Sequence, residues 1–309
     1  MKHVCMALLI VALVLAGAGL ARADYAFAFN IGAAGSGDGQ FQYPLGVALD
    51  GADNLYVADS GNRRIQVFAN DGTFMAAFRN GPFFGPGGVA LDPNGNIFVT
   101  QTATDTGMDR VNVFGPDGTL LNTFGPEGSG DGELLNPVGV AVDADGKVFI
   151  ADGGNGRVMV FANDGTFLYQ IGSFGDGDGQ FFFPQGIAVD AGGNVYVSSV
   201  NSGRGNHAVQ VFGNDGTFLG SIGSFGSDDG QFDAPAGIAV DPDGNIFIAD
   251  FRSHRIQVFA ADGSFLTKFG SQGSGDGQLR QPTFLGLDSS GNVFVADSGN
   301  NRIVVFAPE

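Results

Sequence analysis

The chain is poor in cysteine, basic residues, histidine and glutamate, and each shortage excludes a class of function. The single cysteine, Cys5, lies near the start of an apolar N-terminal segment, so the rest of the chain has no disulfide and no thiolate chemistry. The 14 Lys and Arg residues face 32 Asp and Glu residues, for a formal net charge of −18. Such a surface repels phosphate groups and anionic lipid heads, so we expect no nucleic-acid partner.

Residues 1–23 have the features of a secretory signal peptide. Lys2 supplies a positive start, and an apolar run follows to about Leu15, which is too short to span a bilayer comfortably. Small residues at 21–23 offer a cleavage site. The alternative is an uncleaved N-terminal anchor. We therefore expect an exported protein, periplasmic or extracellular, whose mature chain is residues 24–309 and has no membrane span.

The mature chain consists of one unit that returns six times. Each unit reads P-x-G-[VI]-A-[VL]-D, G-N-[VIL]-[FY]-[VI], [RA]-[VI]-x-V-F and D-G-[TS]-[FL] in order, with small departures. The first-phrase aspartates are Asp50, Asp92, Asp143, Asp190, Asp241 and Asp288, at spacings of 42, 51, 47, 51 and 47 residues. A period of this size indicates stacked units that do not fold alone.

Each unit predicts four short antiparallel strands. In the fifth unit, residues 235–270, four short runs rich in β-branched and aromatic side chains are separated by Asp-Gly and Gly-Asn turns. The runs are nearly continuous in apolar residues, which indicates strands covered on both faces, and no helical period appears. The aspartates stand in Gly-rich turns, so we interpret most of them as turn residues on a solvated surface.

The chain ends predict how the units close into a ring. The sixth unit stops at Phe306 in its third strand, whereas residues 25–32 match the fourth strand and following glycine of the fifth unit, residues 265–270. The N-terminal strand should therefore complete the last unit. We predict an all-β fold: a six-bladed β-propeller of four-stranded antiparallel blades at residues 24–309.

The repeated phrases resemble the NHL repeat over residues 25–309. The resemblance rests on P-x-G-[VI]-A-[VL]-D, G-N-[VIL]-[FY]-[VI]-[AT]-D and N-x-R-[IV]-x-V-F, which recur in order. It implies the propeller fold but not one function, because NHL propellers include RNA-binding modules, protein-interaction modules, extracellular sensor domains and a zinc lyase. In most similar propellers, the end that carries the connections between blades also carries the binding site.

The repeats depart from one another at that end. Between the second and third strands, four units have five positions, as from Asp59 to Arg64, but units two and four have nine. The connection from unit one to unit two is also short. Departures from a regular repeat suggest a site, although surface loops also lengthen at little cost. The polar candidates for binding are Arg79, Gln101, Asp105, Arg110, Arg204, Asn206 and His207.

Two further features have structural interpretations beside functional ones. The Asp…Arg pair at five positions' spacing, present in four units, is expected to join the second strand to the third or one blade to its neighbour. Units two and four break the pair with Gln101, Ser199 and Ala208. Phe284 replaces an inner-strand glycine; it is a candidate for binding by stacking, or it compensates in packing for Gly286.

No cofactor or metal is expected. The G-x-G-D-G-[QE] loops offer one or two aspartates each, too few for calcium, and are interpreted as turns in which aspartate bonds local amides. The zinc lyase that resembles this fold uses three histidines, but only His207 and His254 remain in the mature chain. Lactonase-like propellers use a calcium site with glutamate, and here Glu127 and Glu133 share one connection.

These observations favour a non-catalytic binding module over an enzyme. We expect an exported monomer that recognises a protein or peptide on the end with the long loops, with no catalytic residues. The alternative is a hydrolase or lyase acting on a small polar substrate at the pore mouth, with His207 as its base.

Overall fold

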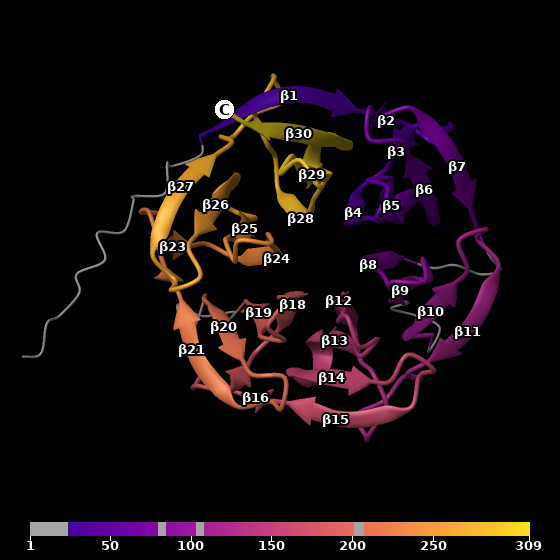
Figure 1. Cartoon of the computed structure of the whole chain (residues 1–309), viewed down its shortest axis with the longest axis vertical. Coiled ribbons are helices and arrows are strands. Elements are labelled where there is room, and N and C mark those ends of the chain that lie inside the picture. The colour runs from indigo at the N-terminus through magenta and orange to yellow at the C-terminus, as the bar shows by residue number, and fades with distance from the viewer. Residues whose placement is uncertain (1–23, 80–84, 103–107, 201–206) are drawn as a thin grey trace, which may run out of the picture.

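The computed structural model describes residues 24–79, 85–102, 108–200 and 207–309. Six four-stranded antiparallel sheets stand around a central channel like the blades of a propeller (Figure 1). The expected leader, residues 1–23, lies outside the described residues. No helix in the described ranges has the length and apolar character needed to cross a membrane. The predicted six-bladed, all-β fold is confirmed.

Each blade runs outward from the channel in chain order. The first three blades are β4 (Pro44–Leu49), β5 (Leu55–Asp59), β6 (Arg64–Phe68) and β7 (Phe74–Phe78); β8 (Pro86–Leu91), β9 (Ile97–Gln101), β10 (Arg110–Phe114) and β11 (Leu120–Phe124); and β12 (Pro137–Val142), β13 (Val148–Asp152), β14 (Arg157–Phe161) and β15 (Phe167–Ile171). The next two are β18 (Pro184–Val189), β19 (Val195–Ser199), β20 (Val209–Phe212) and β21 (Phe218–Ile222); and β24 (Pro235–Val240), β25 (Ile246–Asp250), β26 (Arg255–Phe259) and β27 (Phe265–Phe269).

The two ends of the chain share the sixth blade, as the sequence predicts. Its inner strands are β28 (Pro282–Leu287), β29 (Val293–Asp297) and β30 (Arg302–Pro308), and its outer strand is β1 (Tyr25–Ile31) (Figure 1). The register pairs Tyr25 with Pro308 and Ile31 with Ile303, with one irregularity between Phe27 and Phe29. This pairing closes the ring and covers an edge that β30 would otherwise expose.

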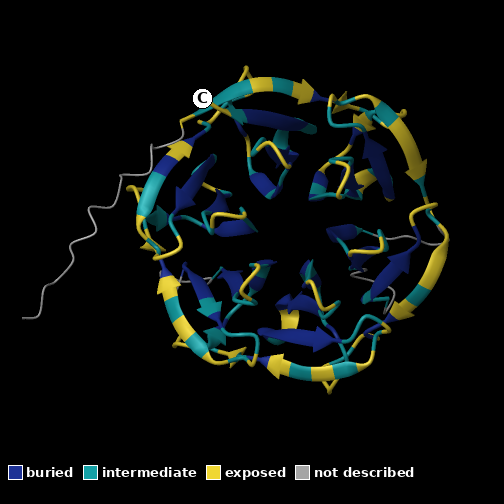
Figure 2. Ribbon diagram, in the orientation of Figure 1, coloured by how far each residue is buried: buried dark blue, intermediate teal, exposed yellow. Residues whose placement is uncertain are grey.

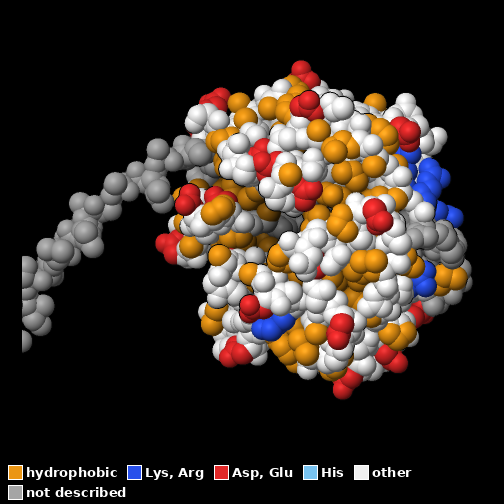
Figure 3. Space-filling model, turned by 45° about the vertical axis from the view of Figure 1, so that its right-hand side comes forward, with side chains coloured by type: hydrophobic (Ala, Val, Ile, Leu, Met, Phe, Trp, Pro, Cys, Tyr) orange, Lys and Arg blue, Asp and Glu red, His pale blue; other side chains and the backbone are white. Residues whose placement is uncertain are grey.

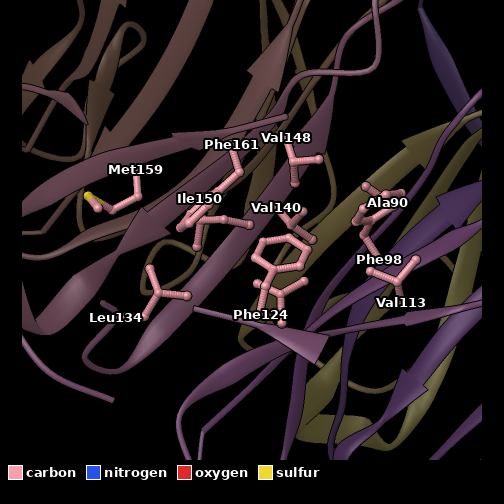
Figure 4. Close-up of a cluster of buried hydrophobic side chains, with 11 residues drawn as sticks. Ala90, Phe98, Val113, Phe124, Leu134, Val140, Val148, Ile150, Met159 and Phe161 are labelled. Carbon is pink, nitrogen blue, oxygen red and sulfur yellow. The ribbon is translucent and has the colours of Figure 1, made fainter. Parts of the chain in front are cut away.

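The core lies between neighbouring blades rather than within one. All five residues of β5, β6, β13, β14, β25 and β26 are buried, whereas most residues of the outer strands are exposed or half-buried (Figure 2). One cluster joins Phe98 and Phe124 of blade two to Val140, Ile150 and Phe161 of blade three (Figure 4). Burial on both faces explains the unbroken apolar runs in the sequence.

Glycine lets the inner strands approach one another around the channel. A Cβ atom on Gly46 would lie 2.4 Å from the carbonyl oxygen of Gly87 in the next blade, and one on Gly186 would lie 2.0 Å from that of Ala236. Neither distance leaves room for a side chain. Phe284 stands at the equivalent position of β28 and is half-buried.

The connections between blades contain short parallel strand pairs that the sequence does not predict: β2 (Ala33–Ala34) with β3 (Gln40–Phe41), β16 (Ser173–Phe174) with β17 (Gln180–Phe181), and β22 (Ser224–Phe225) with β23 (Gln231–Phe232). In the first, the Gly37 N–H donates to Oε1 of Gln40 across 3.0 Å. Equivalent Gln or Glu side chains accept from Gly130, Gly177, Asp228 and Gly275. The prediction that aspartate bonds these amides is wrong, because the longer side chain reaches back to the turn and Asp38 stays exposed.

Candidate binding surface

The molecule has two different ends. Where the second strand of a blade meets the third, the short turns η1 (Ser60–Asn62), η2 (Gly153–Asn155) and η3 (Ser298–Asn300) and the inter-blade connections form what we call the connection end. The opposite end, called here the turn end, carries the turns that follow the inner strands at Asp50 and its five equivalents. Among the described candidates from the sequence, Arg79, Gln101, Arg110 and His207 belong to segments at or next to the connection end.

The predicted Asp–Arg pairs are present in four blades. Nε of the arginine donates to Oδ2 of the aspartate across 2.7 Å from Arg64 to Asp59, with distances of 2.9, 3.1 and 2.8 Å in blades three, five and six. Nη2 of Arg64 also donates to the carbonyls of Gly37 and Gln40 in the preceding connection, at 2.5 and 2.8 Å. The pair therefore joins two strands and anchors the connection, which confirms a structural role.

Burial raises the pKa of two of these paired carboxyls. For Asp152 and Asp250, loss of solvent is the largest influence on the pKa and outweighs the hydrogen bonds and the adjacent arginine, which act to lower it. Both aspartates are fully buried. Each pair is thus held by geometry and hydrogen bonds at some electrostatic cost.

Blade two lacks the aspartate partner of its arginine. The register places Gln101 opposite Arg110, where four other blades have aspartate, and the preceding connection is the short one. Nε of Arg110 is buried and has no hydrogen-bond partner among the described residues. A cleft of about 230 Å³ beside it is lined by Met108, Asp109, Arg110, Thr123, Phe124, Pro126 and Glu127. Gln101 itself is buried and bonds the Met108 carbonyl and Asn112.

His207 of blade four is buried, with 1% of its surface exposed, and is a contact between blades. Its Nδ1 accepts a hydrogen bond from the Ala234 N–H across 3.1 Å, and its ring lies 4.9 Å from that of Phe225. An imidazole that accepts at Nδ1 is neutral, with its proton on Nε2. His207 is therefore not an exposed polar side chain of the loop.

The same contact recurs in other blades and escaped the sequence analysis. In each case a side chain just before the third strand accepts the N–H of the residue before the next blade's first proline. The acceptors and donors are Asp109 with Asn136, His254 with Gln281, and Asn301 with Tyr43, at 2.6, 2.9 and 2.7 Å. The donor residues have positive φ angles, so their N–H groups point away from the sheet ladder. Both mature-chain histidines thus serve as backbone acceptors.

The two remaining candidates that the structure describes lie on different blades. Arg79 is exposed and follows β7 of blade one, whereas Phe284 lies on the inner strand of blade six. Asp105, Arg204 and Asn206 lie outside the described residues. In Figure 3, Lys and Arg side chains lie mainly at one edge of the visible face, and Asp and Glu side chains are spread over the rest.

Exposed aromatic side chains form a feature of the connection end that the sequence analysis missed. Phe174 and Phe225 are 60% and 40% exposed, and they occupy equivalent positions in the connections before and after blade four. The ring of Phe174 lies 5.1 Å from that of Phe182. Other connections have Ala34, Glu127 and Gln272 at this position, a difference visible in the repeat alignment.

The turn end holds a larger hollow at the channel mouth. It has a volume of about 530 Å³ and is bordered by Asp50, Asp92 and Asp143 with the apolar residues that precede them. Their carboxylates have internal partners: Asp50 accepts from the backbone and side chain of Asn54, and Asn163 of blade three donates to Asp92. Burial acts to raise the pKa of Asp50, but these hydrogen bonds and those from Ala52 and Tyr56 outweigh it, and the pKa is lowered.

The described residues contain no group of three or more His, Cys, Asp or Glu side chains placed to hold a metal ion. The turn aspartates are instead used by their own turns. Around Asp190, the Tyr196 hydroxyl donates to the carboxylate across 3.1 Å. Burial, then the charge and hydrogen bond of Asp190, raises the pKa of Tyr196 to about 12.

Comparison with known families agrees with this geometry. The NHL repeat matches residues 41–68, 232–259 and 279–306, and a family described as a 6-bladed beta-propeller matches residues 142–204. Each NHL match starts at the end of a connection and runs through the first three strands of a blade to a phenylalanine of the third. The chain contains NHL repeats and folds as a six-bladed β-propeller.

Similar proteins differ widely in length and description. Over 119 residues the chain is 30% identical to the protein brain tumor of Drosophila melanogaster, a match that covers 37% of this chain and 11% of that protein. A Bacteroides thetaiotaomicron protein of unknown function superposes with a TM-score of 0.72 at 18% identity, over 93% of this chain and 76% of that one. A gluconolactonase from Xanthomonas campestris gives 0.65 at 16% identity, over 93% and 97%. The last two show the fold alone.

Proposed function

We propose that this propeller is an exported, non-catalytic binding module that recognises a protein or peptide at its connection end, and that it acts as a monomer. The observation that carries the proposal is the exposure of Phe174 and Phe225 on the end where the repeat is least regular. Exposed aromatic side chains are unfavourable in water and are typical of interaction surfaces. In the sequence, the long-loop segments 102–109 and 200–208 each follow a second strand, so the proposal assigns them to the same end.

The roles of the two histidines support binding rather than catalysis. His207 and His254 each accept a backbone N–H at Nδ1, which uses the lone pair that a general base needs at that atom. His207 is also almost fully buried. The alternative, a hydrolase or lyase with His207 as its base, would require that contact between blades to open.

Export is part of the proposal and rests on residues 1–23, with their short positive start, apolar run and small residues before Asp24. A periplasmic and an extracellular location are both compatible with these features. The acidic composition favours solubility and makes a basic protein partner more favourable than nucleic acid.

Shortening the two long loops tests the proposal. Removing four residues from each of the segments 102–109 and 200–208 would give all blades the five-position loop. We expect the tagged wild-type mature chain to retain a partner from the exported proteome, identified by mass spectrometry, and the shortened chain to lose it while keeping its thermal midpoint. Equal retention by both chains, or a hydrolytic activity abolished by His207→Asn, would overturn the proposal.

A further inference from the structure

The aromatic side chains of the connection into blade four pack against blade three on one side and are exposed to solvent on the other. Phe174 and Phe183 of the connection into blade four lie close to glycines in a turn of blade three. A Cβ atom on Gly156 would lie 3.0 Å from both Cα and Cδ2 of Phe174, and one on Gly153 would lie 3.0 Å from Cζ of Phe183. The glycine-rich turn of blade three therefore forms a floor on which these rings pack. Phe174 is nevertheless 60% exposed, so one ring surface remains available.

The connection that carries Phe174 also carries two carboxylates that form no ion pair with a described residue. Asp176 and Asp178 follow Phe174 in the same connection, and both are exposed. By contrast, Asp229 in the next connection lies 2.5 Å from Nζ of Lys268. From residue 158 to residue 251 the sequence has eleven aspartates and a single basic residue, Arg204. This third of the ring is thus more acidic than the chain as a whole.

Exposed aromatic faces and carboxylates in the same connection together favour a cationic ligand. A guanidinium group can stack on a phenylalanine face and donate to carboxylates at the same time, because its N–H donors lie in its own plane and point outward from its edge. An aliphatic partner would leave the aspartates unused, and nucleic acid would be repelled. A second copy of this chain is disfavoured as occupant, since its formal charge is −18.

We infer that Phe174 and Phe182, together with Asp176 and Asp178, form a binding surface for an arginine-rich segment of a partner protein. Arginine side chains lie on the aromatic pair, with their guanidinium groups directed to the two carboxylates. Phe225, on the connection after blade four, provides a second exposed ring for a residue further along the segment. The inference rests on the proposed function and adds to it the location of the site and the chemistry of the partner.

A fluorescein-labelled decapeptide of alternating arginine and glycine tests this site by anisotropy at about 50 mM salt. We expect Phe174→Ala/Phe182→Ala to raise the Kd about tenfold, the size of effect of losing stacking on a cation. Asp176 and Asp178 are both exposed, so Asp176→Asn/Asp178→Asn should leave the fold stable. This variant should raise the Kd for the peptide about fivefold and reduce the salt dependence of that Kd. The peptide with lysine in place of arginine should bind more weakly, and the peptide with glutamate should not bind.

Two matched controls separate a site from general attraction to an acidic protein. Asp145→Asn/Asp243→Asn changes the charge equally with exposed residues of the turn end, and Leu168→Ala removes an exposed apolar side chain from β15. Both should keep the wild-type Kd within about twofold. Equal weakening by the control aspartates, or wild-type binding by the double phenylalanine variant, would overturn the inference. If the chain with shortened loops lost its partner but the Phe174 variant kept it, the inference would be overturned and the proposed function would stand.

Discussion

Nε of Arg64 donates to Oδ2 of Asp59 across 2.7 Å, and neither side chain is more than 2% exposed. Oδ1 of the same aspartate accepts the Gln42 N–H at 2.8 Å, so one carboxylate joins two strands and the connection from the preceding blade. The regular pairs build the ring, and the blades without them are candidates for function.

Removing only the carboxylate of this pair should be strongly destabilising. Asp59→Ala would leave the Arg64 guanidinium buried without its counter-charge, so we expect a loss of about 3–5 kcal/mol in the free energy of unfolding. Asp59→Ala/Arg64→Met should recover part of that loss, because no charge remains buried. Guanidinium chloride unfolding measures both; a double variant less stable than the single one would contradict this account.

Blade two offers the converse change. Gln101→Asp would place a carboxylate opposite Arg110 in the register that holds Asp59 opposite Arg64. We expect a gain of about 1–2 kcal/mol, because the buried Nε of Arg110 acquires an acceptor. Gln101→Asn is the matched control without charge and should give no gain. If Gln101→Asp left the thermal midpoint unchanged or lowered it, as the control does, Nε of Arg110 would not be a donor in need of an acceptor.

His207 should be replaceable by asparagine but not by alanine. Asn301 performs the same acceptor role in blade six, where it bonds the Tyr43 N–H at 2.7 Å. His207→Ala would leave the Ala234 N–H without its partner, at a cost of about 1–3 kcal/mol. His207→Asn should recover most of this and should leave partner capture unchanged. Loss of function in the asparagine variant, with stability retained, would favour a catalytic imidazole.

Acid should act on stability in two stages. Burial raises the pKa of Asp152 and Asp250 above the ordinary 3.8, so these carboxyls bind protons more readily when folded and contribute more as pH falls. Hydrogen bonds lower the pKa of Asp50 and, at the exposed turns, of Asp71 and Asp117, whose contribution is present above 3.8 and lost below it. We expect the thermal midpoint to rise slightly from about pH 6 to pH 4 and to fall below about pH 3.8. A steady fall from pH 6 would be inconsistent with these shifts.

Native mass spectrometry of the mature chain, purified without chelator and again with it, tests the expectation of no metal and no self-association. We expect the same metal-free monomer mass in both preparations. A divalent ion bound in fixed proportion and removed by chelator would favour the enzyme alternative, and a dimer would contradict the argument from charge repulsion.

The sequence predicts the ring closely because each repeated phrase specifies a local element, either a turn or a strand. Asp-Gly turns, unbroken apolar strands and the unmatched strand at residues 25–32 define the blades and their closure. The contact between His207 and Ala234 was not predicted, because it joins residues 27 positions apart in neighbouring blades through different residue types. The exposure of Phe174 was also missed, since in a chain with 30 phenylalanines only the packing shows which rings lie outside.

The central claim is that a protein partner binds at the connection end around blade four. Amide hydrogen exchange of the mature chain, alone and saturated with the partner that it captures, tests this most directly. The account predicts slowed exchange in residues 172–183 and 223–234, with the turns after Asp50, Asp92 and Asp143 unchanged. Protection confined to those turns at the channel mouth, with the two connections unchanged, would contradict it.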